Sequence, residues 1–375
     1  MRTSTLQWAI VSVLLLHAPG VQAASAATAP VPVAPISAIE YLGWSGAYRL
    51  RNDEIQVVIV PEIGRIVHIG FLEGENLLRL DEHLHGRTGA AAEPGEWLNF
   101  GGDWLWPVAQ SRWSDFQEGI WPPSPFLDGR PWSGRAWRTE DGSQHCLISR
   151  DFGAPLHVRV SRTIRLDPTN MHISVRQRIE RLESSDIPVT LWHLSQVQDA
   201  EQVVIPVEND SRFEKGITSL MFDTPKKNML YYGQETVVYQ AQRGGEHKLG
   251  SDSPRAWLAA LKGRTLLVAQ ATPGEGQGIY PDGGCTVQLY SNTGLGYAEL
   301  ETLSTEQVLE PGEHINNTIT LALFRLDPVP ETSANLADAV QRLLGEPPLT
   351  PAQSEPEEEH EEPEEQENRL PVGPE

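Results

Sequence analysis

Residues 156–166 read LHVRVSRTIRL and alternate apolar with polar side chains. Consecutive side chains of a β-strand point to opposite faces, so this pattern predicts a strand with one face in the core and the other in water. Arg162 interrupts the pattern, because it stands on the face that carries Val160 and Ile164. An unpaired charge is costly there. We therefore expect either that Arg162 reaches a carboxylate or ligand on the concave side of the sheet, or that the strand bulges.

Similar patterns recur along most of the chain. The turn Asp167-Pro168-Thr169-Asn170 is followed by a second alternating run at 171–179. Further strands are predicted at 55–60, 65–72, 189–197, 203–207, 237–242, 265–271, 286–291, 297–304 and 317–326. More than ten strands with turns between them predict an all-β fold of mainly antiparallel sheets packed face to face. No repeat of fixed period is visible, which argues against a propeller.

One short helix is predicted near the end of this region, at 333–344. Ser333 can cap its first turn. Apolar residues then recur at helical spacing, namely Leu336, Val340, Leu343 and Leu344. We expect this helix to pack on an edge of the β domain, which spans 36–346.

The N-terminal residues have the composition of an export signal. Arg2 is followed by an apolar run at 8–16, a break at Pro19-Gly20 and small residues around Ala23, which is typical of a signal peptide. The apolar run is too short to span a bilayer. We therefore expect a signal peptide at 1–23, a flexible leader at 24–35, no membrane span, and a periplasmic or secreted protein.

The C-terminal residues 347–375 are predicted to be a disordered acidic tail. Nine glutamates lie between Glu355 and Glu367, with no apolar residue among them, so this segment cannot bury enough surface to offset its ordering entropy. Without these glutamates the net charge of −22 becomes about −13. The charge of the whole chain argues against a nucleic-acid binder, which needs an excess of Lys and Arg, and the charge without these glutamates is ordinary for an exported protein.

The sequence shows no motif for a metal or a nucleotide. No pair of cysteines or histidines has the spacing of a zinc site, and no glycine-rich phosphate loop is present. We therefore expect neither metal nor cofactor. Cys146 and Cys285 could form one bridge in an oxidising compartment, but two buried thiols are the favoured interpretation.

A tryptophan-rich segment is the first candidate for a binding surface. Seven of the eleven tryptophans lie between Trp97 and Trp137, around the stretch NFGGDWLWP at 99–107. Flat aromatic faces beside amides and carboxylates suit sugar rings; the alternative is that these tryptophans cover a sheet as core. The residues predicted to bind a carbohydrate are Arg65, Asn99, Asp103, Trp104, Trp106, Gln110, Trp113 and Gln196.

Acid–base groups are predicted on two further strands. Alternation in YAELETL, residues 297–303, places Tyr297, Glu299 and Glu301 on one face. Two neighbouring carboxylates repel, so we expect one raised pKa, as a general base requires; a solvated polar face is the alternative. His193 shares a face with Val197, and it is either a hydrogen-bonded core residue or part of a site.

In their order along the chain, these segments resemble the galactose-mutarotase-like superfamily, which includes the aldose 1-epimerases, and especially its uncharacterised exported members. The resemblance covers residues 41–326. It is carried by YRLRNDEIQVVIVPEIGRIVHIGFLEGENLLR (48–79), NFGGDWLWPVAQSRW (99–113), PVTLWHLSQV (188–197) and YAELETLSTEQVLEPGEHINNTITLALFRL (297–326).

The resemblance implies a β-supersandwich with a sugar site on the concave sheet. Glu299 or Glu301 would be the base, and His193 an acid or a hydroxyl anchor. The chain departs from the family where its first histidine would stand, because Asn99-Phe100 occupies that place and Phe100 cannot transfer a proton.

We therefore expect an exported carbohydrate-binding protein. The enzymatic version of this expectation is a sugar 1-epimerase-like enzyme in which another residue replaces the usual acid. One alternative is a non-catalytic envelope or scaffold protein that binds a partner through the tryptophan-rich face. Another is a glycan hydrolase or lyase that uses Asp103, Asp115 or Asp128 together with the Glu pair. The oligomeric state does not follow from the sequence.

Overall fold

The computed structural model describes residues 32–89, 96–272 and 278–345. The predicted signal peptide, the leader up to residue 31 and the tail 347–375 lie outside these residues. The last four residues of the predicted leader form a strand, β1 (Pro32–Pro35). Within the described part of the chain, no helix has the length and apolar character needed to cross a membrane.

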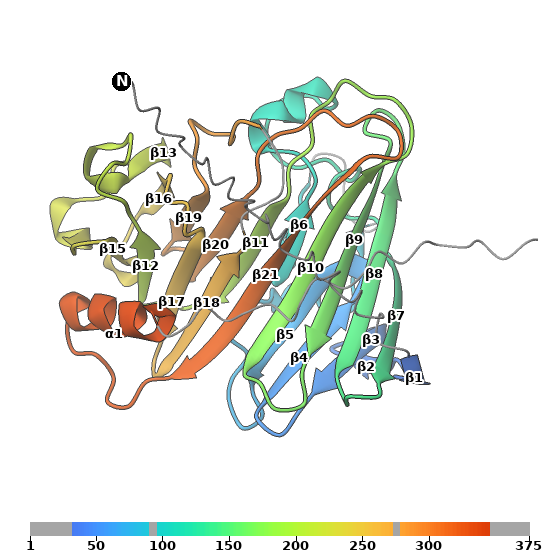
Figure 1. Ribbon diagram of the computed structural model, residues 1–375, viewed down its shortest axis with the longest axis horizontal. Helices are drawn as coiled ribbons and strands as arrows, with labels where there is room; N and C mark the ends of the chain where they lie inside the picture. The colour runs from blue at the N-terminus through green and yellow to red at the C-terminus, as the bar shows by residue number, and fades with distance from the viewer. Residues whose placement is uncertain (1–31, 90–95, 273–277, 346–375) are drawn as a thin grey trace, which may run out of the picture. The chain divides into compact units, whose positions relative to one another are not determined.

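Two large antiparallel sheets form the fold (Figure 1). The larger has eleven strands, in the spatial order β1, β7 (Ser133–Thr139), β8 (Gln144–Phe152), β9 (Val158–Leu166), β10 (His172–Arg181), β21 (His314–Arg325), β18 (Thr265–Ala271), β17 (Trp257–Lys262), β12 (Gln202–Pro206), β15 (Thr236–Gln240) and β14 (Leu230–Tyr232). The smaller has ten, in the order β13 (Thr218–Phe222), β16 (Glu246–Ser251), β19 (Val287–Asn292), β20 (Tyr297–Leu303), β11 (Trp192–Gln198), β6 (Asp103–Trp106), β5 (Arg65–Phe71), β4 (Ile55–Val60), β3 (Trp44–Arg51) and β2 (Ile39–Tyr41). The predicted all-β sandwich is therefore confirmed.

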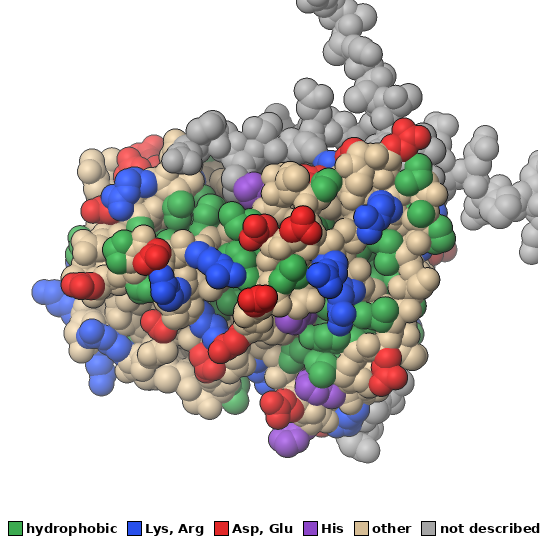
Figure 2. Space-filling model, turned by 90° about the horizontal axis from the view of Figure 1, so that it is seen from below, with side chains coloured by type: hydrophobic (Ala, Val, Ile, Leu, Met, Phe, Trp, Pro, Cys, Tyr) green, Lys and Arg blue, Asp and Glu red, His purple; other side chains and the backbone are tan. Residues whose placement is uncertain are grey.

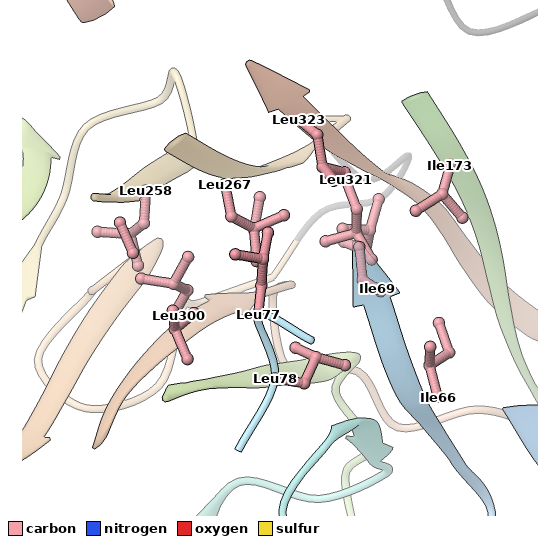
Figure 3. Close-up of a cluster of buried hydrophobic side chains, with 14 of the residues drawn as sticks. Ile66, Ile69, Leu77, Leu78, Ile173, Leu258, Leu267, Leu300, Leu321 and Leu323 are labelled. Carbon is pink, nitrogen blue, oxygen red and sulfur yellow. The ribbon is translucent and has the colours of Figure 1, made fainter. Parts of the chain in front are cut away.

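The main hydrophobic core lies between the two sheets. In β9 and β10, buried and partly exposed residues alternate along the whole strand, as the period of two predicts. Figure 3 shows branched side chains of both sheets meeting in this core, with Leu267 and Leu321 from the larger sheet and Ile69 and Leu300 from the smaller. All four are at most 1% exposed. Burying such a side chain stabilises the fold by about 1.5–3 kcal/mol.

The predicted helix is α1 (Ser333–Gly345), which packs on the outer face of the larger sheet beside β12 and β15 (Figure 1). Leu336 and Val340 are fully buried against apolar side chains of that face, such as Trp257. The cap differs from the prediction. Thr332 Oγ1 accepts the Asn335 N–H at 3.2 Å, so Thr332 rather than Ser333 caps the first turn. Cys146 and Cys285 are buried and unpaired.

Arg162 of β9 reaches a carboxylate, which is the first of the two expected outcomes. Its side chain is fully buried between the sheets, where its guanidinium pairs with the Asp103 carboxylate and donates to the Asp103 carbonyl at 3.1 Å. Ser195 Oγ donates to Asp103 Oδ2 at 2.6 Å, and His193 Nε2 lies 3.2 Å from the same oxygen. We call these four residues the inter-sheet polar network. It lies inside the sandwich, not on a concave outer surface.

Removing one partner of a buried ion pair leaves the other charge uncompensated. We therefore expect Arg162→Met to lower the free energy of unfolding by about 3–5 kcal/mol in urea titrations. The matched control is Arg159→Met on the outer face of the same strand, where the ion pair with Asp151 is about half exposed and is expected to contribute less than about 1 kcal/mol. Equal effects of the two substitutions would contradict this account of the network.

Candidate functional site

The outer face of the smaller sheet gathers acidic, basic and aromatic side chains. In β20, Ala298 and Leu300 belong to the inter-sheet core, so Tyr297, Glu299 and Glu301 project to the opposite side. Strand register then places neighbouring side chains on this face: Glu299 stands opposite Gln196 of β11, Glu301 opposite Leu194, and Leu194 opposite Trp104 of β6. We call the resulting set the outer-face cluster; it comprises Arg65, Arg79, Asn99, Trp104, Trp192, Gln196, Lys248, Gln288, Tyr290, Tyr297, Glu299 and Glu301.

Glu301 is completely buried and is held through one of its two oxygens. Its Oε2 accepts the Trp192 indole N–H at 2.8 Å and lies 3.2 Å from the Lys248 ammonium. The same ammonium lies 5.0 Å from the centre of the Trp192 ring, within range of a cation–π interaction. Glu301 Oε1 is buried and has no hydrogen-bond partner among the described residues.

Glu299 is 8% exposed and is the more accessible of the two carboxyls. Its Oε1 accepts a hydrogen bond from Gln196 Nε2 at 2.7 Å, and this amide also donates to Asn99 Oδ1 at 3.1 Å. Burial and the neighbouring Glu301 charge raise the pKa of Glu299 to about 7. Burial also raises the pKa of Glu301, against the opposing effect of Lys248. The sequence-based expectation of a raised carboxyl pKa thus has a physical cause in the structure.

Arg65 and Arg79 border the Glu pair but are engaged by other groups. Arg65 is fully buried, pairs with Asp128 at 2.6 Å and lies 4.0 Å from the centre of the Trp104 ring. Arg79 donates to Asn99 O at 2.8 Å and lies 5.1 Å from the centre of the Tyr297 ring. Both guanidiniums are therefore fixed in place and shape one side of the cluster.

Three further polar atoms of the cluster are buried without a partner among the described residues, namely Arg65 Nε, Trp104 Nε1 and Gln288 Oε1. Together with Glu301 Oε1 they offer two donors and two acceptors. Buried polar groups are normally hydrogen-bonded, so this combination indicates a place where a polar ligand or ordered water completes the bonding. A carbohydrate hydroxyl both donates and accepts, and it could satisfy either kind of atom.

The tryptophans themselves are mostly core. Trp104, Trp106 and Trp113 are at most 3% exposed, and the Trp106 ring centre lies 5.0 Å from those of both Trp113 and Trp192 in edge-to-face contacts. The alternative stated for this segment, a tryptophan cover packed on a sheet, is the arrangement found for these three residues. Of the segment's indoles, Trp121 is 54% exposed.

His193 and Asp103 lie on the opposite face of the sheet from the Glu pair. His193 stands opposite Thr302 of β20, and both His193 and Asp103 belong to the inter-sheet polar network. Burial lowers the pKa of His193 to about 4, so its imidazole is neutral at pH 7. The structure therefore does not bring His193 or Asp103 together with Glu299 and Glu301, and the expectation that they share one cavity is wrong.

Gln110 is also apart from the cluster. It begins the short 3₁₀ helix Gln110–Asp115, and its amide donates to Ile120 O at 3.2 Å within the same loop region. The structure does bring Arg65, Asn99, Trp104 and Gln196 around the Glu pair, as predicted. It adds Lys248, which no pattern in the sequence indicates because β16 shows no clear alternation.

Elsewhere, a groove of about 410 Å³ lies between turns at one end of the sandwich, around Phe71, Glu75, Lys262 and Arg264. Figure 2 views the molecule from the end where these turns lie, and acidic and basic side chains are interspersed there. Lys262 already pairs with Glu75 at 3.1 Å. Among the described residues, no group of three or more His, Cys, Asp or Glu side chains is arranged to hold a metal ion.

The raised pKa of Glu299 predicts a pH-dependent stability. The folded protein holds this proton more tightly than the unfolded chain, for which the ordinary pKa is 4.5. Its stabilising contribution is therefore complete below about pH 4.5 and is lost as the pH rises towards 7. Across this window we expect the free energy of unfolding of the parent protein to decline by on the order of 3 kcal/mol. Glu299→Gln should remove this decline, as measured by urea unfolding at several pH values. The exposed control Glu310→Gln should leave the decline intact, and an unchanged decline in Glu299→Gln would refute the assignment.

Solved structures with the same arrangement of strands include a candidate aldose 1-epimerase from Klebsiella pneumoniae, with a TM-score of 0.54 and 11% sequence identity over 82% of this chain and 86% of that one. A TPR-domain-containing protein from Parabacteroides distasonis has a TM-score of 0.51 and 12% identity, over 76% of this chain and 49% of that one. A galactose mutarotase-like protein from Clostridium acetobutylicum has a TM-score of 0.48 and 11% identity, over 78% of this chain and 99% of that one.

At this level of identity the likeness shows the fold alone, which is similar to that of the Klebsiella pneumoniae protein. No curated protein sequence matches the chain. One family model matches residues 47–323, which is most of the chain, and its description is a domain of unknown function. The chain therefore belongs to the DUF4380 family.

Proposed function

We propose that this protein binds a carbohydrate at the outer-face cluster and that Glu299 and Glu301 act there as acid–base groups in an epimerase-like reaction. We also propose that it acts after export, as the composition of residues 1–23 suggests. The observation that carries the proposal is the pair of buried carboxyls on one sheet face, beside a set of unpartnered buried donors and acceptors.

The cluster has the groups that recognition of a pyranose requires. Trp104 Nε1 can donate to a hydroxyl oxygen, while Glu301 Oε1 and Gln288 Oε1 can accept hydroxyl protons. Glu299 is the carboxyl nearest to solvent, so a ligand would meet it first. Since Glu301 Oε1 is buried, side chains over the cluster must move before a sugar reaches it.

Ring opening of an aldose needs one group that accepts the proton of the anomeric hydroxyl and one that donates a proton to the ring oxygen. Two neighbouring carboxyls of which one is ionised and one is protonated supply both roles, because the charge of the first opposes ionisation of the second. Phe100 is buried, with its ring centre 6.5 Å from that of Trp44, and no histidine lies in the outer-face cluster. The proton donor of this proposal is therefore a glutamate.

The other two hypotheses receive less support from the geometry. A hydrolase that uses Asp103 with the Glu pair is incompatible with the position of Asp103 between the sheets. Asp128 is bound by Arg65 and by the Trp97 indole N–H at 2.8 Å. A scaffold role through the tryptophan-rich face would depend on Trp121 rather than on the buried Trp104, Trp106 and Trp113.

Interconversion of sugar anomers tests the proposal. We expect the full-length protein to accelerate equilibration of α-glucose or α-galactose, followed by proton NMR. Glu299→Gln and Glu301→Gln should each reduce this rate by about 10²–10⁴-fold, the range typical of a lost acid or base. Glu310→Gln, which changes an exposed carboxyl, should retain the full rate.

Two results would count against the proposal. If the parent protein accelerates anomer equilibration of no aldose, the proposed epimerase-like activity is rejected. Carbohydrate binding at this cluster is rejected if, in addition, the parent protein retains no carbohydrate on an array. It is also rejected if the variant that lacks both glutamates retains the same carbohydrate as the parent.

A further inference from the structure

Lys248 is the one described ammonium in contact with the Glu pair, and it contacts only one member. It belongs to β16, where it stands opposite Tyr290 of β19, which in turn stands opposite Glu299. Its side chain nevertheless reaches Glu301 in the next row of the sheet, with Nζ 3.2 Å from Glu301 Oε2. Lys248 is 7% exposed, so water screens this ion pair little.

The surroundings of the two carboxyls differ in charge. Glu301 contacts the Lys248 ammonium and the Trp192 N–H, whereas Glu299 accepts a hydrogen bond from the neutral amide of Gln196. The charges of Lys248 and Arg65 also lower the pKa of Glu299, but the Lys248 ammonium contacts Glu301, and the Arg65 guanidinium pairs with Asp128 at 2.6 Å. The difference favours the ionised form at Glu301.

The remaining titratable groups around the pair do not reverse this difference. Tyr290 and Tyr297 face Glu299, and burial raises the pKa of both phenols, so they are neutral at pH 7. Asp282 adds negative charge near Glu301, but its Oδ2 accepts a hydrogen bond from Gln288 Nε2 at 2.7 Å. Lys248 is thus the group that distinguishes the two carboxyls.

We propose that Lys248 is a positioning residue that keeps Glu301 ionised and leaves the proton of the pair on Glu299. The assignment of roles to a sugar rests on the proposed function, but the charge assignment holds for the ligand-free protein. It answers which glutamate is the base: Glu301, through its unpartnered Oε1. Glu299 is the acid.

The corresponding step is balanced. Glu301 takes the proton of the anomeric hydroxyl, the O–H electron pair becomes the second bond of the C1 carbonyl, and the bond from C1 to the ring oxygen breaks. Its electron pair takes the proton of Glu299. The pair still holds one proton, now on Glu301. When the C5 hydroxyl oxygen attacks the other face of the carbonyl, Glu299 takes the hydroxyl proton and Glu301 gives its proton to the carbonyl oxygen, so the pair returns to its starting state.

Carboxyl ¹³C NMR of the full-length, sugar-free protein tests the charge assignment. Glutamate labelled at Cδ gives one resonance per side chain, and Glu299→Gln and Glu301→Gln identify the two that matter. As the pH falls from 9, we expect the Glu299 resonance to titrate before the Glu301 resonance, which still has the position of an ionised carboxylate at pH 7. Lys248→Met should move the proton to Glu301, so that the two resonances exchange their behaviour, and Lys248→Arg should restore the parent pattern.

A protonated Glu301 at pH 7 in the parent protein overturns the proposal, even if Lys248→Met does not fold. A folded Lys248→Met protein with both titrations unchanged overturns it too. Because no sugar is present, these outcomes are independent of the proposed function. Absence of anomer conversion together with the expected titrations would reject the function and retain the charge assignment.

Discussion

A β-strand sends consecutive side chains to opposite faces, and the arrangement of this protein depends on that constraint in β20 and β11. The Leu300 side chain points into the core between the sheets, so its neighbours Glu299 and Glu301 point to the outer face. The same period sends His193 inward and its neighbour Trp192 outward to Glu301. Shifting either strand by one residue would bury carboxylates in the apolar core, so the core and the candidate site specify each other.

Each side of the smaller sheet therefore carries its own polar group. Between the sheets, Asp103 is neutralised by Arg162 and bonded by Ser195, and no acceptor oxygen of its carboxylate lacks a partner. On the outer face, Glu301 keeps one buried oxygen without a partner among the described residues. In the inner network one donor, Arg162 Nε, also lacks a partner among the described residues, whereas the outer cluster has both donors and acceptors without partners, which a ligand can fill.

Strands in which apolar and polar side chains alternate could be predicted from the sequence. It predicted β4 and β18 with their observed bounds, the neighbouring strands β9 and β10 within two residues, and the helix α1. It did not predict β17, whose sequence WLAALK is buried on both sides because α1 packs over it. It did not predict β6 either, which lies within the tryptophan-rich segment. Such strands show no period of two, and their assignment depends on which other elements cover them.

The site was predictable in part for the same reason. Glu299, Asn99, Trp104 and Gln196 could be grouped from strand patterns and the family resemblance, but His193 was preferred to Trp192, one residue away on the other face. Lys248 could not be found, because its partner Glu301 is 53 residues later in the chain and two strands away in the sheet. The burial of Trp104 likewise depends on packing that composition does not determine.

The most direct test of the central claim is a crystal structure of the protein with a bound monosaccharide that it retains in solution. The account predicts electron density for the pyranose on the outer face of β20 and β11, with hydroxyls bonded to Glu299, to Glu301 Oε1 and to Trp104 Nε1. A sugar bound elsewhere, for example in the groove beside Phe71 and Lys262, with the Glu pair untouched, would contradict it.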